Sequence, residues 1–132
     1  MATSALMAVT LLVPDYDQAI AFYVGCVGFE LVEDTDLGSG KRWVRIRPKN
    51  SEGACLLLAR AVGAEQIAQI GRQAGGRVFL FFQTDDFRRD HARMLTAGVK
   101  FRELPRHEPY GIVAVFEDPY GNCFDLIEPR RE

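Results

Sequence analysis

The chain passes through one pattern of secondary structure twice, and this doubling constrains its fold more than any other feature. Apolar residues recur with the period of a helix between Asp15 and Gly28. The same pattern recurs 70 positions later, between Asp85 and Gly98. Each helix follows a short β-type run and precedes three more. The expected strands span residues 9–13, 29–34, 42–47 and 54–60 in the first half, and 78–83, 99–104, 112–116 and 122–127 in the second. The sequence therefore predicts two half-domains with the order βαβββ.

The two half-domains are short enough to form one domain. The 132 residues, 48% of them hydrophobic, can bury a sizeable core, and we predict a single α+β domain over residues 1–132. We place the first module at residues 5–60, a linking helix at 64–74 and the second module at 76–129. Either module alone would leave one face and one edge of a small sheet uncovered. The modules are therefore expected to pair, either within one chain or across a dimer.

Charge and composition narrow the range of partners. The formal net charge is -2, and Lys and Arg are scattered along the chain, which argues against nucleic acid and against a membrane surface. The longest apolar stretches have the length of strands, and residues 1–12 lack the basic start of an export signal. The three cysteines form no CxxC pair. We therefore expect a cytoplasmic protein with reduced thiols and no disulfide.

The segment from Glu117 to Glu128 combines a tight turn with a strand that holds one acid among apolar residues. Because side chains alternate along a strand, apolar Phe124 and Leu126 face one way and Asp125 faces the other. A carboxyl group away from bulk water needs a partner or a function. Asp125 is therefore expected to point into a cavity.

Several features together resemble the vicinal oxygen chelate superfamily, which includes glyoxalase I, fosfomycin and bleomycin resistance proteins, and extradiol dioxygenases. The resemblance runs from about Leu6 to Glu128 and rests on the doubled βαβββ order and on short motifs. These motifs are Val13-Pro14-Asp15, Ala21-Phe22-Tyr23, Gly28-Phe29 and the closing Asp118-Pro119-Tyr120-Gly121-Asn122. The resemblance implies a curved mixed sheet around a ligand cavity, with helices outside, and commonly a homodimer. It leaves the reaction open, because one fold supports unrelated chemistries.

The resemblance also implies four metal-ligand positions, of which this chain keeps one. Metal-dependent relatives place a His near the start of each module's first strand and a carboxylate in each module's last strand. Here the two His positions fall on Ala8 and Val78, and the last strand of the first module offers only Cys55. Asp125 alone matches the pattern. Since a catalytic divalent site normally needs about three protein ligands, we expect no metal cofactor, with a divalent metal recruited by other residues as the less favoured alternative.

The loop before the strand at 112–116 holds the best candidates for acid/base chemistry. His107 has an ordinary pKa suited to proton transfer near neutral pH, and Glu108 or Asp125 could orient it. The structural alternatives are that His107 and Glu108 cap a turn beside Arg106, and that Asp125 pairs with an arginine across the sheet. The other histidine, His91, falls on the apolar face of its helix and is expected to be structural.

The strand at 42–47 supplies candidates for ligand binding. Its alternation places Trp43, Arg45 and Arg47 on one face, which would suit a planar or anionic ligand through stacking and bidentate contacts. The alternative is an ordinary solvated edge. Arg77 and Tyr110, at the borders of two predicted strands of the second module, complete the expected ligand contacts.

These observations lead to one reading with two alternatives. We expect a homodimeric, glyoxalase-like protein that binds a small polar or anionic molecule, with metal-independent acid/base catalysis by His107, Glu108 and Asp125 if it is an enzyme. The first alternative is a drug- or metabolite-binding protein of the bleomycin-resistance kind without catalysis. The second is a divalent-metal-dependent lyase or dioxygenase.

Overall fold

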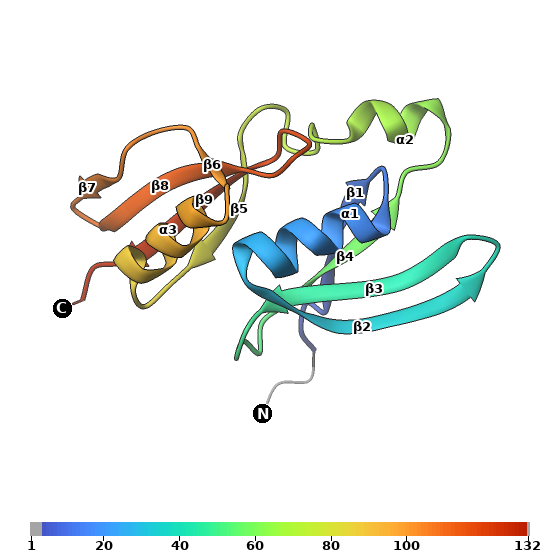
Figure 1. Ribbon diagram of the computed structural model, residues 1–132, viewed down its shortest axis with the longest axis horizontal. Helices are drawn as coiled ribbons and strands as arrows, with labels where there is room; N and C mark the ends of the chain where they lie inside the picture. Colours follow the sequence, from blue (N-terminus) through green and yellow to red (C-terminus); the bar gives the residue numbers. More distant parts are fainter. Residues whose placement is uncertain (1–3, 132) are drawn as a thin grey trace. The chain divides into compact units, whose positions relative to one another are not determined.

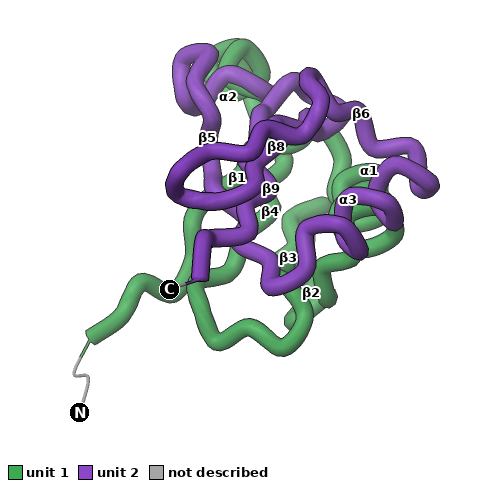
Figure 2. The backbone as a smooth tube through the Cα atoms, turned by 90° about the vertical axis from the view of Figure 1, so that its left-hand side faces the viewer, with its two compact units in different colours: residues 1–70 green, residues 71–132 purple. Residues whose placement is uncertain are grey.

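The computed structural model describes residues 4–131 and confirms the α+β fold with two βαβββ modules (Figure 1). The chain divides into two compact units, one that ends at Ile70 and one that begins at Gly71 (Figure 2). Each unit contains one mixed sheet with a helix on one face.

The sheet of the first unit has the strand order β1-β4-β3-β2. Strand β1 pairs in parallel with β4, and the other neighbours are antiparallel. The strands span Ala8–Val13 (β1), Phe29–Gly38 (β2), Lys41–Pro48 (β3) and Cys55–Arg60 (β4). Val44 and Ile46 of β3 are fully buried, so the opposite face of β3 carries its polar side chains.

The helix predicted between Asp15 and Gly28 consists of two segments. Asp15 caps the first, α1 (Tyr16–Ile20), by accepting a hydrogen bond from the Gln18 backbone N–H at 2.7 Å. The chain then widens into the π-helix η1 (Ala21–Val27), which ends with a hydrogen bond from the Gly28 N–H to the Tyr23 carbonyl at 3.0 Å. Periodicity in the sequence does not distinguish the wider turn from an α-helix.

The first unit ends with a shorter helix than the predicted 64–74. Helix α2 spans Gly63–Gln69, because Ile70 leaves the helical conformation at ψ 125°. Two other boundaries also differ in this unit: β2 continues to Gly38, and β3 begins at Lys41, so the β2–β3 turn is tighter than predicted.

The sheet of the second unit has the order β5-β9-β8-β6, and β7 also pairs with β8. Its elements are β5 (Val78–Gln83), α3 (Phe87–Thr96), β6 (Lys100–Phe101), β7 (Arg106–Glu108), β8 (Gly111–Glu117) and β9 (Cys123–Pro129). The strand predicted over 99–104 is therefore reduced to β6, and β7 is an element that the sequence analysis assigned to a loop. Between β6 and β7 the chain leaves the sheet. Side chains bridge this segment, and Arg106 Nε donates a hydrogen bond to Glu103 Oε2 at 3.0 Å.

The core of the second unit is a chain of aromatic rings beneath α3. Phe116 stacks on Phe124 with 5.2 Å between ring centroids, and Phe101 lies 5.6 Å from Phe116. His91 of α3 stacks on Phe87 at 5.2 Å and meets Phe101 edge-on at 4.5 Å. His91 therefore packs as an aromatic ring, in agreement with its predicted structural role.

We expect this packing to make the second unit less stable in mild acid. Burial holds the pKa of His91 below its usual value of 6.5, so the unfolded chain binds the proton more readily than the folded one. The contribution of neutral His91 to the free energy of unfolding is complete above the pKa that His91 has in the unfolded chain. It is lost as pH falls through the lower pKa that His91 has in the folded protein. Chemical denaturation at several pH values between 7.5 and 5 should show a steeper loss for the wild type than for His91→Phe.

A substitution elsewhere on α3 provides the control. Leu95 is 50% exposed, and Leu95→Ala removes no titratable group, so it should keep the wild-type pH dependence. An equal slope for His91→Phe and the wild type would contradict this account of His91.

Candidate functional site

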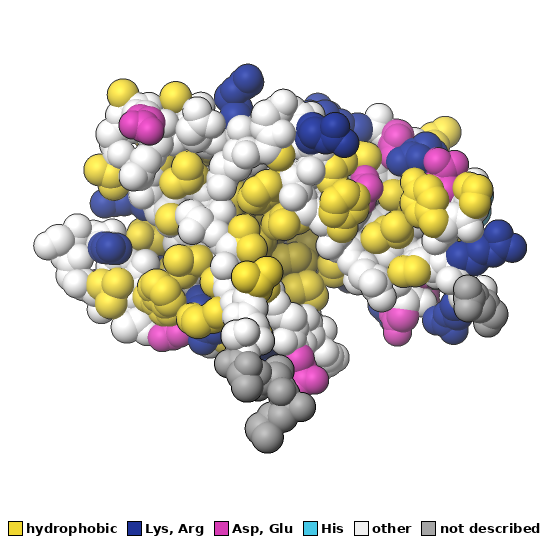
Figure 3. Space-filling view, turned by 180° about the vertical axis from the view of Figure 1, so that it is seen from behind, with side chains coloured by type: hydrophobic (Ala, Val, Ile, Leu, Met, Phe, Trp, Pro, Cys, Tyr) yellow, Lys and Arg dark blue, Asp and Glu magenta, His cyan; other side chains and the backbone are white. Residues whose placement is uncertain are grey.

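The sheet of the second unit has one face under α3 and one face without a helix, which we call the open face. On β9, Phe124 and Leu126 are 2% and 0% exposed and lie on the helix side. The side chains that alternate with them, including Asp125, lie on the open face. The sequence prediction that Asp125 faces away from Phe124 and Leu126 is therefore consistent with the structure. Figure 3 shows the side of the molecule away from α3, where hydrophobic side chains of this unit lie among acidic and basic ones.

Asp125 has an exposed aromatic ring beside it. Strand register pairs Asp125 with Phe81 on β5 and with Val115 on β8, so these three residues form one row across the open face. The Phe81 side chain is 69% exposed, a large fraction for a phenyl ring on a sheet. An exposed aromatic ring and a partly buried carboxyl group are thus immediate neighbours on this face.

One oxygen of Asp125 lacks a hydrogen-bond partner. Among the residues that the structure describes, only Asp125 Oδ1 and Arg47 Nε are buried side-chain polar atoms without a hydrogen bond. Burial raises the pKa of Asp125 above its usual value, the positive charge of Arg106 opposes this, and the negative charge of Glu103 reinforces it. The Asp125 carboxyl group is therefore destabilised in its charged form, and its buried Oδ1 has an unfilled hydrogen-bond position.

A network of charged side chains lies beside Asp125 on the same face. Arg106 donates to Glu103 Oε2 at 3.0 Å and to Glu108 Oε2 at 2.9 Å. The Val115 backbone N–H also donates to Glu103 Oε2, at 3.1 Å, which anchors the network to β8. Hydrogen bonds to Glu103 and then Tyr110 raise the pKa of Arg106, so this guanidinium is fixed in its charged form.

The unfilled hydrogen-bond position of Asp125 predicts that Asp125→Asn stabilises the protein at neutral pH. Removing the charge relieves the cost of desolvating an unpaired carboxylate, and we expect a gain of about 1 kcal/mol in the free energy of unfolding. Because the folded pKa is raised, the penalty is absent below the unfolded pKa and develops as pH rises through the folded pKa. Urea denaturation should therefore show a larger gain at pH 7 than at pH 4. A loss of stability at pH 7 would mean that Asp125 has a stabilising partner.

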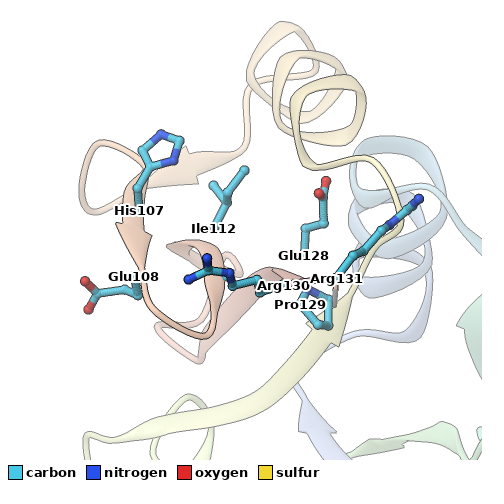
Figure 4. A pocket seen from close by; sticks show the side chains of 8 residues that line it. His107, Glu108, Ile112, Glu128, Pro129, Arg130 and Arg131 are labelled. Carbon is cyan, nitrogen blue, oxygen red and sulfur yellow. The ribbon is translucent and has the colours of Figure 1, made fainter.

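The structure does not bring His107 together with Asp125. His107 pairs with Ile112, and Ile112 pairs with Glu128, so these three side chains lie in one row. They point to the same side in Figure 4, which is the helix side of the sheet, whereas Asp125 is on the open face. Glu108 lies on the open face and binds Arg106, not His107. The predicted catalytic pairing of His107 with Glu108 or Asp125 is therefore absent.

The row of His107 borders a shallow surface depression of about 340 Å³ at the end of the sheet. Glu128 in this row accepts a hydrogen bond from the Phe87 N–H at 2.8 Å, so its carboxylate stabilises the first turn of α3. This carboxylate already has a structural role, and His107 is exposed. Glu108, the predicted partner of His107, also lines the depression, but its carboxylate binds Arg106, and the described residues show no hydrogen bond between it and His107.

The predicted ligand residues of the first unit carry ion pairs along the β2–β3 hairpin. Arg45 Nε lies 3.0 Å from Glu33 Oε1, and Arg47 Nε lies 3.7 Å from Glu30 Oε1. Trp43 is partly buried on the same face of β3. Each arginine therefore faces a carboxylate across the hairpin, which reduces the positive charge that an anionic ligand would need.

The two remaining predicted ligand residues belong to loops of the second unit. Arg77 is exposed in the turn before β5, and its backbone N–H donates to the Ala74 carbonyl at 3.2 Å. Tyr110 is 53% exposed in the β7–β8 turn and interacts with Arg106, so it belongs to the charged network near Asp125. Of these two residues, only Tyr110 is tied to the network beside Asp125 by an interaction that the structure shows.

The residues at the four metal-ligand positions do not fit a divalent metal. Ala8 pairs with Cys55 in the first unit, and Val78 pairs with Cys123 in the second, so Cys55 and Cys123 are equivalent positions. Leu57 and Asp125 each lie two residues further along the strand and are therefore also equivalent. Alanine, valine and leucine side chains have no donor atoms for a metal. Over residues 4–131, no three His, Cys, Asp or Glu side chains form a group that could hold a metal ion.

Sequence reasoning missed Phe81, Glu103 and the role of Arg106. Phe81 was assigned to a strand, but its position beside Asp125 depends on a register shift between Val78 and Leu80 that no sequence pattern reveals. Every residue of β5 except Gln83 is apolar, so polar/apolar alternation gave no signal for the face of Phe81. Within the described part of the chain, no helix is long and apolar enough to cross a membrane.

Comparisons with known proteins give consistent similarities. The family model described as "Glyoxalase/Bleomycin resistance protein/Dioxygenase superfamily" matches residues 5–126. An uncharacterized protein from Shewanella frigidimarina (strain NCIMB 400) is 53% identical over 125 residues, which cover 94% of this chain and 93% of that protein.

Two solved structures are similar over nearly their whole length. The structure of TnmS3, described as an antibiotic binding protein from Streptomyces sp. CB03234, has 32% sequence identity and a TM-score of 0.78, with 98% of this chain and 99% of that chain covered. The structure of UcmS2 has 31% identity and a TM-score of 0.82, with 96% of this chain and 98% of that chain covered.

Proposed function

The chain belongs to the Glyoxalase/Bleomycin resistance protein/Dioxygenase superfamily, and we propose that it is a binding protein for small planar aromatic molecules. The observation that carries this proposal is the pairing of Phe81 with Asp125 on the open face of the second unit. A ring that is 69% exposed offers a stacking surface, and the adjacent, partly exposed carboxyl group of Asp125 can accept one directional hydrogen bond.

This combination is typical of ligand sites in which apolar contact supplies most of the affinity and a few polar groups fix the orientation. Val115 completes the row as an apolar neighbour of Asp125 on β8. The stability cost of keeping Asp125 charged without a partner also supports a functional role, because binding sites often hold groups that the fold alone would not favour.

Similarity to TnmS3 supports binding of a small molecule. That protein is described as antibiotic binding, and its similarity to this chain extends over both units. We therefore favour the alternative of a drug- or metabolite-binding protein over the acid/base enzyme expected first.

An enzyme would need a proton-transfer pair, and the geometry offers little support for one. His107 and Asp125 lie on opposite faces of the sheet, and Glu108 binds Arg106. The proposed binding uses no metal, because Asp125 has no fellow donors at the corresponding positions of Ala8, Leu57 and Val78. The homodimer and the cytoplasmic location stay predictions.

Titration with acridone tests the proposal. Acridone is a neutral tricyclic aromatic with one ring N–H, which matches a stacking surface next to an acceptor. Isothermal titration calorimetry should give a dissociation constant below about 100 μM, and backbone amide NMR shifts should concentrate at Phe81, Asp125 and Val115. Absence of binding, or shifts confined to the depression near His107 and Glu128, would overturn the proposal.

A further inference from the structure

We propose that the open face of the second unit selects its planar ligands by charge, and that it takes aromatic cations with an N–H donor in preference to aromatic anions. This inference rests on the proposed function and specifies its ligand class. It differs from the polar or anionic ligand that the sequence predicts from Arg45 and Arg47.

The charges near Asp125 have an excess of carboxylates. Glu103 and Asp125 carry two negative charges beside one cation, Arg106, which also donates to a third carboxylate, that of Glu108. Arg106 already donates to both glutamates, at 3.0 and 2.9 Å, so its guanidinium offers few donors to an incoming anion. An anionic ligand would therefore meet uncompensated negative charge, whereas a cationic ligand would relieve it.

Two other cations of this sheet, Lys100 and Arg102, are engaged elsewhere. Arg102 Nε lies 2.6 Å and Lys100 Nζ 3.6 Å from Glu117 Oε2, near the first residue of β9. The charges that shift the pKa of Asp125 are those of Arg106, which lowers it, and Glu103, which raises it. Lys100 and Arg102 therefore compensate Glu117 and leave the carboxylate excess around Asp125 in place.

Asp125 provides the directional part of the selection. Asp125 and Phe81 are register partners on neighbouring parallel strands, which lie about 5 Å apart in a sheet. A ring stacked on Phe81 can thus place an N–H at its edge to donate a hydrogen bond to the partly exposed carboxyl group of Asp125, whose Oδ1 is enclosed and lacks a protein partner. A charged donor makes this hydrogen bond about twice as strong as a neutral one.

Phe81 favours the same charge. The face of a phenyl ring is electrically negative, so it attracts a cation placed above it and repels an anion. The exposed side chain leaves this face available. The stacking surface and the carboxylate therefore discriminate in the same direction.

Three ligands with one tricyclic ring system test the inference: proflavine (a cation at neutral pH), acridone (neutral) and acridine carboxylate (an anion). At pH 8, calorimetry on the full chain should show that proflavine binds at least about tenfold more tightly than acridine carboxylate, with acridone between them. In Asp125→Asn this ratio should fall to about threefold or less, since the variant keeps the side-chain shape and loses the charge.

Asp85→Asn is the matched control, because it also removes one negative charge. Asp85 is exposed just before α3 and forms an ion pair with Arg89, so it does not face the site. The control variant should keep the wild-type ratio. Equal affinities for the three ligands, a preference for the anion, or an unchanged ratio in Asp125→Asn would overturn charge selection while leaving the proposed binding function intact. Failure of all three ligands to bind would instead overturn the proposed function.

Discussion

Replacing Gly71 by alanine is expected to lower the free energy of unfolding by about 3 kcal/mol. Gly71 has φ +75°, a conformation that costs L-residues energy, and a Cβ atom there would lie 1.8 Å from the Tyr120 carbonyl oxygen. That oxygen belongs to the backbone and cannot rotate away. The substitution therefore combines backbone strain with an overlap that only a shift of the chain can relieve.

The turn that Gly71 contacts is rigid, which is why we expect little relief. The buried Asp118 Oδ1 accepts hydrogen bonds from the backbone N–H groups of Tyr120, at 2.9 Å, and Asn122, at 2.8 Å. The Asn122 side chain donates to Asp118 Oδ2 at 2.7 Å. This network explains the closing Asp-Pro-Tyr-Gly-Asn motif as a structural turn that aligns β9 and hence Asp125.

Urea denaturation of the variant and a control measures the effect. Gly98→Ala is the control, because Gly98 has a similar φ of +89° but no atom within 4 Å of the added Cβ. It should cost only about 1 kcal/mol, from backbone strain alone. Equal losses for the two variants would show that the chain relaxes around Gly71, and would contradict the rigid contact with the turn.

Phe81→Ala is expected to weaken acridone binding by about tenfold or more, which corresponds to the loss of one aromatic stacking surface. The same variant should change the stability of the protein little, because the Phe81 side chain is already 69% exposed. Calorimetric titration and urea denaturation of one preparation would give both values. Loss of affinity without loss of stability is the signature of a contact made to the ligand.

Two further variants make this experiment specific. Phe81→Trp keeps an aromatic surface and should retain most of the affinity, whereas Leu95→Ala removes an exposed apolar side chain from α3 and should have no effect on binding. Unchanged affinity in Phe81→Ala would exclude the open face as the acridone site.

The sequence predicted the order of helices and strands well. Helix caps and side-chain alternation are local properties, and the same local pattern occurs twice in the chain. Asp15 caps α1 as predicted, and the second helix begins after Asp86, which accepts a hydrogen bond from the Arg89 N–H at 3.1 Å. The alternation in β9 also placed Asp125 opposite Phe124 and Leu126. These features depend on neighbours within a few residues.

The site was harder to predict, because it depends on register and on pairing across strands. His107 lies in β7, a strand of three residues that the loop-like sequence conceals, and its pairing with Ile112 of β8 sets the face on which it lies. Arg45 and Arg47 suggested an anion site, yet Glu33 and Glu30 on the neighbouring strand pair with them. Alternation within one strand predicts which side chains share a face, but it does not predict what lies across from them.

The proposed function requires Asp125 to be a ligand-facing carboxyl group on the open face of the second unit. Carbon-13 NMR of the Asp125 carboxyl carbon, followed across pH with and without proflavine, tests this requirement most directly. We predict a pKa above the ordinary value in the free protein, because of burial, and a decrease when the cation binds beside Oδ1. An ordinary pKa that proflavine leaves unchanged would contradict this role of Asp125.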